Sequence, residues 1–453
     1  MTSKPEPMLS VDEAQDRLLA ATGDPLPAED VALESALDRV LAAPILSALD
    51  LPPWDNSAMD GFAIRAADVA NATQGSPVRL RVVAEVRAGG SPDVALPPGC
   101  AVRIATGARM PVSADTVVPV EATIVEMAGA GADAGHARSG SPRPLGFRAG
   151  EPLPEACLVT AAAEPGAFVR RRGEDVRAGT SLLQPGRRIT AAQIALAAAV
   201  GVGSLRVHRR TVAAVLSTGD ELRSFGEPLG ESGIPDANRP GLLAMCRSAG
   251  ADAIDLGIVP DSLDSVLAAL KPAIRQADVL IVSGGVSVGP YDVVRSAFET
   301  VGRVELWRVA VQPGKPFAFG RSEPRQADAR RVLMFGLPGN PVSALVTFEL
   351  FVRPVLDRLS GLTSSPVDVD VAITEDGLQK AAGRRGFLRV AVARDEKGAP
   401  IRDSKGRLRV RRSGHQGSHV LSAMAVADAL AIVPETVDQL GPGAEVEIRW
   451  LRR

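Results

Sequence analysis

The sequence predicts a multidomain protein of the α/β plus β class: a doubly wound, mostly parallel α/β domain flanked by a helical linking segment and two small β domains. A length of 453 residues is too great for one compact core. In the middle of the chain, unbroken apolar strands alternate with helices, as in a parallel sheet covered on both faces. On either side, short β-branched runs bounded by Gly and Pro indicate small β domains.

Domain boundaries are expected where these patterns change. Ser10 with Glu13 three residues on is a capping-box pattern, and it predicts a helical segment from about Ser10 to Leu51. Residues 128–143 are rich in Ala, Gly, Ser and Pro, which indicates a flexible insertion. The predicted domains are a helical linking domain (residues 1–51 and 184–210), a small β domain (52–183), an α/β domain (211–360) and a C-terminal β domain (361–453).

Charge balance and cysteine content exclude several classes of protein. The 51 basic and 53 acidic residues nearly cancel and form no basic stripe, so nucleic acid is not an expected partner. Cys100, Cys157 and Cys246 are far apart, which fits a reducing compartment and argues against a disulfide framework. The N-terminus has no signal-peptide pattern, and the sequence has no run of about 18 apolar residues. We therefore expect a cytoplasmic protein that does not contact a membrane.

Polar, glycine-containing turns follow three of the apolar strands in the α/β segment. Helices are expected to follow as well, at residues 239–249, 263–276 and 342–359. Ligands bind outside the carboxyl ends of parallel strands, where glycines let the backbone approach a phosphate. Neither dinucleotide-binding nor P-loop spacing occurs at these turns. The turn residues expected at this edge are Ser217, Thr218, Gly219, Ser283, Gly284, Gly285, Asn340 and Ser343.

Carboxylates in Gly- or Pro-flanked turns are candidates for a metal site. Oxygen ligands of this kind suit Mg²⁺ bridging a phosphate better than they suit zinc. Any one of them, taken alone, could be a solvated loop carboxylate. The candidates are Asp60, Asp175, Glu221, Asp236, Asp261 and Asp292.

A second group of candidates involves cations and a loop in the C-terminal segment. His415 and His419 have the spacing of a zinc pair, but the surrounding glycines favour a loop that binds an anion with Ser418 and backbone N–H groups. Lys315 lies in a Pro-Gly-Lys-Pro turn, and arginines including Arg389 gather at the start of the last domain. These arginines could protect a strand edge, or they could bind an oxyanion.

These motifs together resemble one family. The segments DNSAMDGFAIR, RIATGARMP, RRGEDV, STGDEL, DANR, SGGVSVGPYD, PGKPFAFG, FGLPGNPVSA and GHQGSH are similar, in order and rough spacing, to those of molybdopterin molybdenumtransferases of the MoeA type, which also include the gephyrin E domain. The resemblance implies a homodimer in which the α/β domain of one subunit faces the small domains of the other. It also implies a reaction: adenylylated molybdopterin and molybdate give molybdenum cofactor and AMP, with Mg²⁺ as the divalent cation.

The resemblance also implies roles for particular residues. Asp292, Glu221, Asp261 and Asp60 are the implied catalytic residues, and Asp292 and Glu221 the implied Mg²⁺ ligands. Lys315, Arg389 and Ser418 match positions attributed to molybdate binding. The remaining residues implied to bind the substrate are Thr106, Asp175, Ser217, Thr218, Gly219, Asp236, Asn238, Ser283, Gly284, Gly285, Asn340 and Ser343.

One departure and two alternative functions complete the prediction. Gln312 stands where many relatives have lysine, so the molybdate site lacks one cation. A non-catalytic scaffold, or a pterin- or nucleotide-binding relative sharing only the α/β domain, are the alternatives; the complete set of flanking motifs speaks against the second. A molybdopterin adenylyltransferase and molybdoenzyme maturation proteins are the expected partners besides a second copy of the chain.

Overall fold

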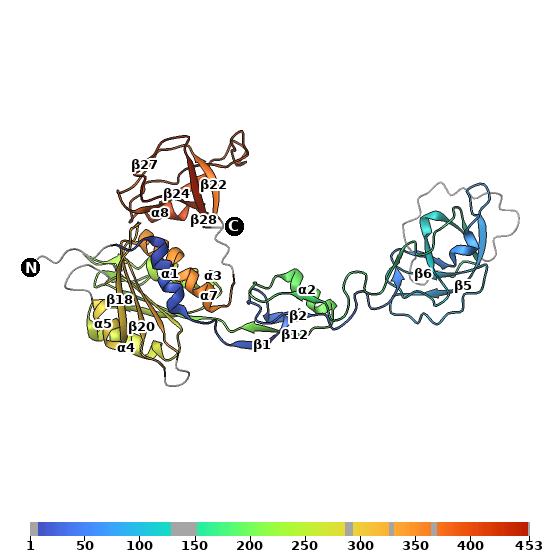
Figure 1. Cartoon of the computed structure of the whole chain (residues 1–453), viewed down its shortest axis with the longest axis horizontal. Coiled ribbons are helices and arrows are strands. Elements are labelled where there is room, and N and C mark those ends of the chain that lie inside the picture. Colours follow the sequence, from blue (N-terminus) through green and yellow to red (C-terminus); the bar gives the residue numbers. More distant parts are fainter. Residues whose placement is uncertain (1–7, 128–151, 286–292, 326–329, 364–368, 452–453) are drawn as a thin grey trace, which may run out of the picture. The chain divides into compact units, whose positions relative to one another are not determined.

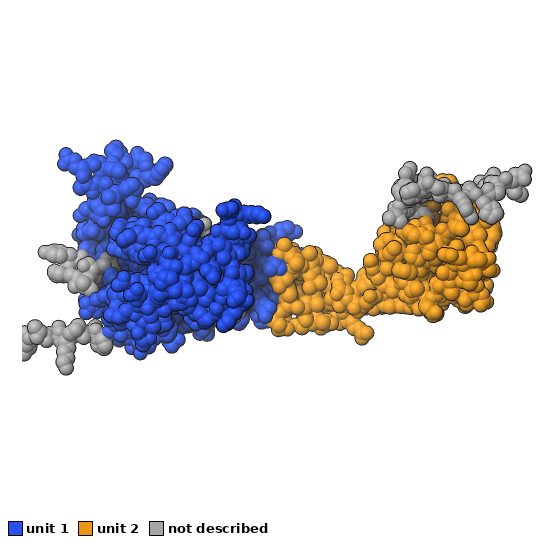
Figure 2. All heavy atoms as spheres, turned by 90° about the horizontal axis from the view of Figure 1, so that it is seen from above, with its two compact units in different colours: residues 1–43, 185–190, 205–453 blue, residues 44–184, 191–204 orange. Residues whose placement is uncertain are grey.

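The computed structural model describes residues 8–127, 152–285, 293–325, 330–363 and 369–451. The chain divides into two compact units (Figure 2), one of residues 1–43, 185–190 and 205–453 and the other of residues 44–184 and 191–204. The chain therefore leaves the larger unit twice and returns to it twice. The four-domain division stays a prediction, and the insertion expected at residues 128–143 lies outside the described residues.

The smaller unit is built on a six-stranded sheet in the order β7-β4-β6-β5-β9-β8. Phe62 and Ile64 of β4 are fully buried in its core. Gly61 starts the same strand, where a Cβ atom would lie 2.1 Å from the Val118 carbonyl oxygen, so only glycine allows this close pairing. The strands are β4 (Gly61–Ile64), β5 (Val78–Val86), β6 (Cys100–Ile104), β7 (Thr116–Pro119), β8 (Thr123–Glu126) and β9 (Ala156–Val159). The prediction of a small β domain is confirmed.

Shorter elements complete this unit. They connect the ends of the sheet domain to the chain segments that lead back to the larger unit. These elements are β2 (Ile45–Leu46) paired with β11 (Ser181–Leu183), β3 (Asn56–Ser57) paired with β10 (Val169–Arg170), and helix α2 (Ala191–Ala199).

The larger unit contains a six-stranded sheet in the order β16-β13-β17-β21-β20-β18 (Figure 1). The first four strands are parallel, and β20 and β18 are antiparallel additions at one edge. The doubly wound, mostly parallel sheet predicted from the sequence is confirmed. The strands are β13 (Val212–Thr218), β16 (Asp252–Val259), β17 (Val279–Ser283), β18 (Gly302–Arg308), β20 (Pro316–Ser322) and β21 (Leu333–Leu337).

Helices cover both faces of this sheet because its strands are apolar on both sides. Ala213 and Val215 of β13 pack into one core, and Ala214 and Leu216 pack into another. The first core includes residues of α1 (Val11–Thr22) and α3 (Asn238–Ser248), and the second includes residues of α4 (Leu263–Ile274) and α5 (Val293–Val301). Two buried faces explain why the strands lack polar alternation.

The last predicted helix is interrupted by one wide turn. It consists of α6 (Pro341–Thr347), a π-helical segment (Phe348–Val352) and α7 (Arg353–Leu359). The Glu349 carbonyl in this segment accepts a hydrogen bond of 2.8 Å from Nη2 of Arg449 in the C-terminal domain. A π turn disturbs the regular ladder of backbone hydrogen bonds, and here the buried side chain of Arg449 supplies a donor for the Glu349 carbonyl.

The C-terminal domain is a small barrel. Its sheet order is β19-β24-β25-β22-β28-β26, and β24 also pairs with β26, which closes five strands into a ring. Leu388 and Val390 lie in its apolar core. The elements are β19 (Val311–Gln312), β22 (Val369–Thr374), β23 (Leu378–Gln379), β24 (Arg385–Val392), β25 (Arg409–Arg412), α8 (Leu421–Ala425), β26 (Ala429–Val433), β27 (Gln439–Leu440) and β28 (Glu445–Trp450).

The predicted helical linking segments are only partly helical. The capping box at Ser10 is present, with its Oγ accepting from the Glu13 N–H at 3.1 Å, but the helix ends at Thr22. The prediction is wrong for β1 (Ala28–Ala32) and β12 (Ser204–His208), which pair with each other. Proline residues follow the helix, and the pairing joins segments more than 170 residues apart, so local periodicity could not reveal it.

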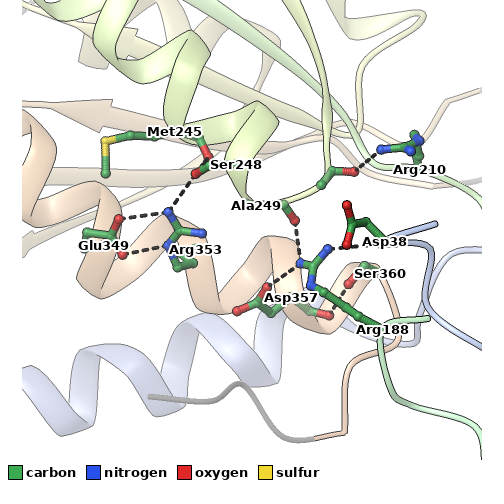
Figure 3. Close-up of polar contacts among 11 residues, drawn as sticks. Asp38, Arg188, Arg210, Met245, Ser248, Ala249, Glu349, Arg353, Asp357 and Ser360 are labelled. Atoms are coloured by element: carbon green, nitrogen blue, oxygen red, sulfur yellow. Dashed lines mark hydrogen bonds and ion pairs between the residues drawn. The ribbon is translucent and has the colours of Figure 1, made fainter. Parts of the chain in front are cut away.

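Arginines tie the linking segment to helices of the α/β domain. Figure 3 shows Arg188 reaching the end of α3, where Nη2 donates to the Ala249 carbonyl at 2.7 Å, and reaching Asp357 of α7. In the same view, Arg353 forms a two-bond ion pair with Glu349.

Among the described residues, no helix is long and apolar enough to cross a bilayer.

The start of β17 depends on a buried carboxylate. Asp278 is 6% exposed, accepts two hydrogen bonds of 2.7 Å from Arg209, and accepts another of 3.0 Å from the Val212 N–H. Its own N–H bonds to the Val212 carbonyl, so this residue joins two adjacent parallel strands at their first residues.

We expect Asp278→Ala to lower the free energy of unfolding by about 3 kcal/mol, because it leaves a partly buried guanidinium and a backbone N–H without their acceptor. Urea unfolding checks this. Asp30→Ala is the matched control, since Asp30 pairs with Arg206 but its side chain is 64% exposed, and the change should be much smaller. Equal losses in both variants would contradict the assignment.

Candidate functional site

The parallel register brings three sequence turns to one edge of the sheet. Ser217 of β13 lies opposite Ser283 of β17, and Ser283 lies opposite Leu337 of β21. Thr218 lies opposite Val259 on the other side of β13. The turns that follow these strands therefore begin side by side, as predicted from their strand ends.

Side chains from the start of α3 connect these turns. Ser217 Oγ donates to Asp236 Oδ1 at 3.1 Å, and Asn238 Nδ2 donates to Ser283 Oγ at 2.8 Å and to the Gly339 carbonyl at 2.7 Å. Ser217 and Ser283 are buried, so these hydroxyls are held in one position. Four predicted site residues thus form two hydrogen-bonded groups, Ser217 with Asp236, and Asn238 with Ser283 and the last turn.

Two glycines bring the backbone of the β17 turn against β13. Gly284 has φ +94°, and a Cβ atom there would lie 2.2 Å from the Thr218 carbonyl oxygen. Gly285 has φ +61°, and its Cβ would lie 3.0 Å from Thr218 Cγ2 and 3.6 Å from Asp261 Oδ1. Only glycine fits both positions, because the turn packs directly against the end of β13.

Carboxylates lie beside this edge. Thr218 Oγ1 donates to Asp261 Oδ1 at 2.5 Å, and the Asp261 N–H donates to Asp220 at 3.2 Å. Glu221 folds back over Gly219, since a Cβ at that glycine would lie 2.8 Å from Glu221 Oε2. Asp261 and Glu221 are both exposed.

The carboxylates fit one mode of Mg²⁺ binding. Among the described residues, no group of three or more His, Cys, Asp or Glu side chains could hold a metal. Mg²⁺ is commonly held by one or two carboxylates together with substrate phosphates, and exposed Asp261 and Glu221 can supply such ligands. Asp292, the principal predicted metal ligand, lies outside the described residues.

The start of α6 adjoins the remaining predicted residues. Ser343 is buried in its first turn, and Asn340 precedes it as an exposed N-cap without a side-chain cap bond. Gly314 packs on this helix, where its Cβ would lie 2.4 Å from Thr347 Cγ2, and Lys315 follows it directly. The Val342 N–H donates to the Ser418 carbonyl at 3.1 Å. Lys315, Ser343 and Ser418 are therefore brought to one helix.

Arg389 of β24 is the most unusual charged group here. It is completely buried, and burial lowers the pKa of its guanidinium to about 10. Nη2 donates to the carbonyls of His415 and Gly417 at 3.3 and 3.1 Å. Among the described residues, Nε and Nη1 have no hydrogen-bond partner. A buried cation with free donors and no carboxylate beside it is a site that an anion can complete.

The loop with His415 is held to β24 by an amide that the sequence analysis missed. Gln416 Oε1 accepts from the Arg389 N–H at 2.9 Å, and its Nε2 donates to the Arg389 carbonyl at 3.0 Å. The segment is a loop, as the glycines predicted. Gln416 lies within the GHQGSH motif, but a single glutamine in a loop has no sequence pattern that indicates a bond to a distant strand.

Two further residues have roles that the sequence did not suggest. Arg239 orients Asp236, with Nε donating at 2.9 Å, and also pairs with Asp255. Gln312, where the sequence resemblance led us to expect a lysine, accepts from the Ala381 N–H at 2.7 Å. The Gln312 side chain therefore holds the backbone of the segment that precedes β24.

In the smaller unit, two predicted residues contact each other. Asp60 Oδ1 accepts hydrogen bonds from the backbone N–H and the hydroxyl of Thr106, at 2.6 and 2.9 Å. Asp175 is exposed, and its N–H bonds to the Leu51 carbonyl at 3.0 Å. The pair of Asp60 and Thr106 joins two of the sequence motifs, whereas no side-chain contact joins Asp175 to them within the described residues.

These features define a multidomain α/β and β protein whose polar groups gather at the carboxyl edge of a parallel sheet and against a small barrel. Three family models match it: "MoeA N-terminal region (domain I and II)" at residues 9–201, "Probable molybdopterin binding domain" at 214–358, and "MoeA C-terminal region (domain IV)" at 371–451. The chain belongs to the MoeA family.

Individual relatives agree over nearly the whole length. The molybdopterin molybdenumtransferase of Haemophilus influenzae is 34% identical over 443 residues, which cover 97% of this chain and 98% of the relative. That of Nostoc sp. is 38% identical and covers 80% of this chain and 76% of the relative. The solved structure of the molybdopterin biosynthesis moea protein from Pyrococcus horikosii has a TM-score of 0.75 at 30% identity, covering 99% of this chain and 100% of that one.

We expect Arg389→Met to raise the free energy of unfolding by about 1–4 kcal/mol, because an apolar chain of similar length removes an uncompensated buried charge. The thermal unfolding midpoint checks the sign. Arg385→Met is the control: Arg385 pairs with Asp12 and Glu435, so its loss should lower the midpoint. A lower midpoint for Arg389→Met would mean that its two backbone hydrogen bonds outweigh the desolvation of the charge.

Proposed function

We propose that this chain is a molybdopterin molybdenumtransferase, which inserts molybdenum from molybdate into adenylylated molybdopterin and releases AMP in a Mg²⁺-dependent reaction. The names of relatives that match 97% and 80% of the chain support the transfer of molybdenum. The identity of the substrates and products is inferred from the chemistry of Arg389, of the turns at the strand ends and of the carboxylates beside them.

The buried guanidinium of Arg389 is the observation that carries this proposal. Molybdate is a tetrahedral dianion, and the unpartnered Nε and Nη1 donors of Arg389 could each bond one of its oxygens; because both atoms are buried in this structure, the neighbouring loop of His415 would have to move to admit the anion. Ser418 lies in the same loop as the two carbonyls that position Nη2, and Lys315 directly follows Gly314, which packs against helix α6. These three residues are therefore proposed to bind molybdate.

The strand ends are proposed to hold the phosphates of adenylylated molybdopterin. Gly284 and Gly285 let the turn after β17 pack closely against Thr218, and exposed Asn340 precedes α6 at the neighbouring strand end. Pro341 has no N–H and the Val342 N–H bonds to Ser418, so the Ser343 N–H is the donor that the start of α6 could offer to an anion. The hydroxyl of Ser217 is oriented by Asp236, so it is fixed rather than free to rotate.

The reaction requires two anions to meet, and the residues are suited to position them. Cleavage of the phosphoanhydride by water separates AMP from molybdopterin, whose dithiolene then binds molybdenum. Asp292 and Glu221 would hold Mg²⁺, which would neutralise charge on the scissile phosphate. The protein's side chains would bind and orient the substrates and neutralise their charge, without forming a covalent intermediate.

Purified protein supplied with adenylylated molybdopterin, molybdate and Mg²⁺ should release AMP and active cofactor together, and EDTA should stop both. Arg389→Met should raise the molybdate concentration for half-maximal insertion about tenfold to a hundredfold, since one charge-assisted contact contributes about 1.5–3 kcal/mol. Arg394→Met is the control, because Arg394 lies beyond the end of β24 and donates a hydrogen bond to the Gly398 carbonyl rather than to the loop of His415; it should leave the molybdate concentration for half-maximal insertion unchanged.

Two outcomes would replace this proposal. Absence of AMP release with intact substrate binding would favour a non-catalytic scaffold or a relative that only binds a pterin or nucleotide. If Arg389→Met left the molybdate dependence unchanged but weakened binding of the pterin nucleotide, the C-terminal domain would clamp the substrate. The oxyanion site would then lie among the turns of the α/β domain.

We also propose a homodimer in which the second subunit completes the site. Asp60 and Thr106 form a polar pair in a unit that has its own core, separate from the core beneath the strand ends. Light scattering at micromolar concentration should give twice the chain mass of 47.1 kDa. A mass equal to that of one chain would contradict the homodimer.

A further inference from the structure

Two successive turns of the C-terminal domain repeat one sequence. Residues 394–398 read Arg-Asp-Glu-Lys-Gly and residues 402–406 read Arg-Asp-Ser-Lys-Gly, eight positions later. They form the hairpins that connect β24 to β25, and backbone hydrogen bonds close each turn in the same way, from the Gly398 N–H to the Asp395 carbonyl and from the Gly406 N–H to the Asp403 carbonyl.

The side chains repeat as well. Asp395 Oδ1 accepts two backbone N–H groups at 2.9 Å, and Asp403 Oδ1 does the same. The glycines have φ +82° and +79°, which suits glycine in a tight turn. Each turn is therefore held by its own aspartate, which fixes the backbone that carries the following lysine, Lys397 or Lys405.

Only the second of these lysines faces a cavity. A cavity of about 550 Å³ lies between the second turn and the barrel, and its walls include four cationic side chains and the indole of Trp450. The cations are Arg394, Arg402, Lys405 and Arg407. Its volume lies within the range of small-molecule sites.

The charges around this cavity are not balanced. Two carboxylates also line it, but each already accepts a hydrogen bond, Asp370 from Trp450 Nε1 at 2.9 Å and Asp428 from the Val392 N–H at 2.8 Å. Arg407 is paired with Asp403 and Glu445. Within the described part of the chain, Arg394, Arg402 and Lys405 form no ion pair, so three unpaired cations face two hydrogen-bonded carboxylates and the walls carry an excess of positive charge.

This cavity is separate from the proposed molybdate site. Val392 and Arg394 line the cavity. Successive side chains of a strand point to opposite faces, so these two even-numbered residues lie on the other face from Arg389. Arg389 contacts the loop of His415 and Gly417, none of which lines the cavity.

We propose that the cavity is a second anion site that binds a polyphosphate chain, free or carried by a nucleotide. Three cations without carboxylate partners match a chain of adjacent phosphates better than a single small oxyanion, because the charges are spread along the wall. Trp450 offers an aromatic surface on which a base could stack if the ligand is a nucleotide. The inference does not depend on the proposed transfer of molybdenum.

The full chain carrying Trp54→Phe and Trp307→Phe leaves Trp450 as its single tryptophan. Its emission should change saturably when sodium tripolyphosphate is added in EDTA. Lys405→Gln should weaken binding about threefold to tenfold. Lys397→Gln is the matched control, since it changes the equivalent lysine of a turn whose lysine does not line the cavity, and should leave binding unchanged.

Calorimetric titration of the natural chain, with and without Lys405→Gln, gives the same comparison if the tryptophan replacements prevent folding. ATP binding tighter than tripolyphosphate would support the site and identify a nucleotide, whereas equal affinities would support it and identify the phosphate chain alone. No saturable binding, or equal weakening by the two lysine variants, would overturn the proposal, because general surface charge would then explain the result.

Discussion

The parallel register of β13, β17 and β21 is the constraint on which the candidate site depends. Because Ser217 lies opposite Ser283, and Ser283 opposite Leu337, three turns start at one level of the sheet. A shift of one residue would turn the serine hydroxyls to the other face of the sheet. Asn238 then bonds to both Ser283 and Gly339, so one amide holds two of the turns at a fixed separation.

In the C-terminal domain, the arginine proposed to bind an anion lowers the stability of the fold. A guanidinium buried without a carboxylate costs free energy of folding, and burial correspondingly lowers the pKa of Arg389. The amide of Gln416 and the carbonyls of His415 and Gly417 hold this charge in place without neutralising it. Such an arrangement fits a group whose counter-ion arrives with the substrate.

The same domain also contains cations that are fully neutralised, and the contrast separates structural from functional charge. Arg385 pairs with Asp12 and Glu435, and Arg407 pairs with Asp403 and Glu445. Arg389 and Lys405 have no carboxylate partner among the described residues. Sequence position alone does not distinguish these four side chains, since all lie in strands or hairpins rich in basic residues.

What the sequence determined by itself was local. Alternating apolar strands and helices predicted the α/β domain, the Ser10 capping box predicted the start of α1, and glycines at strand ends predicted turns against a ligand. The tertiary structure decided the rest: the pairing of β1 with β12, the burial of Arg389, and the bond from Asn238 to a carbonyl 101 residues away. These features depend on which distant segments meet, because pairing, burial and missing counter-charges are set by neighbours in space that no local pattern records.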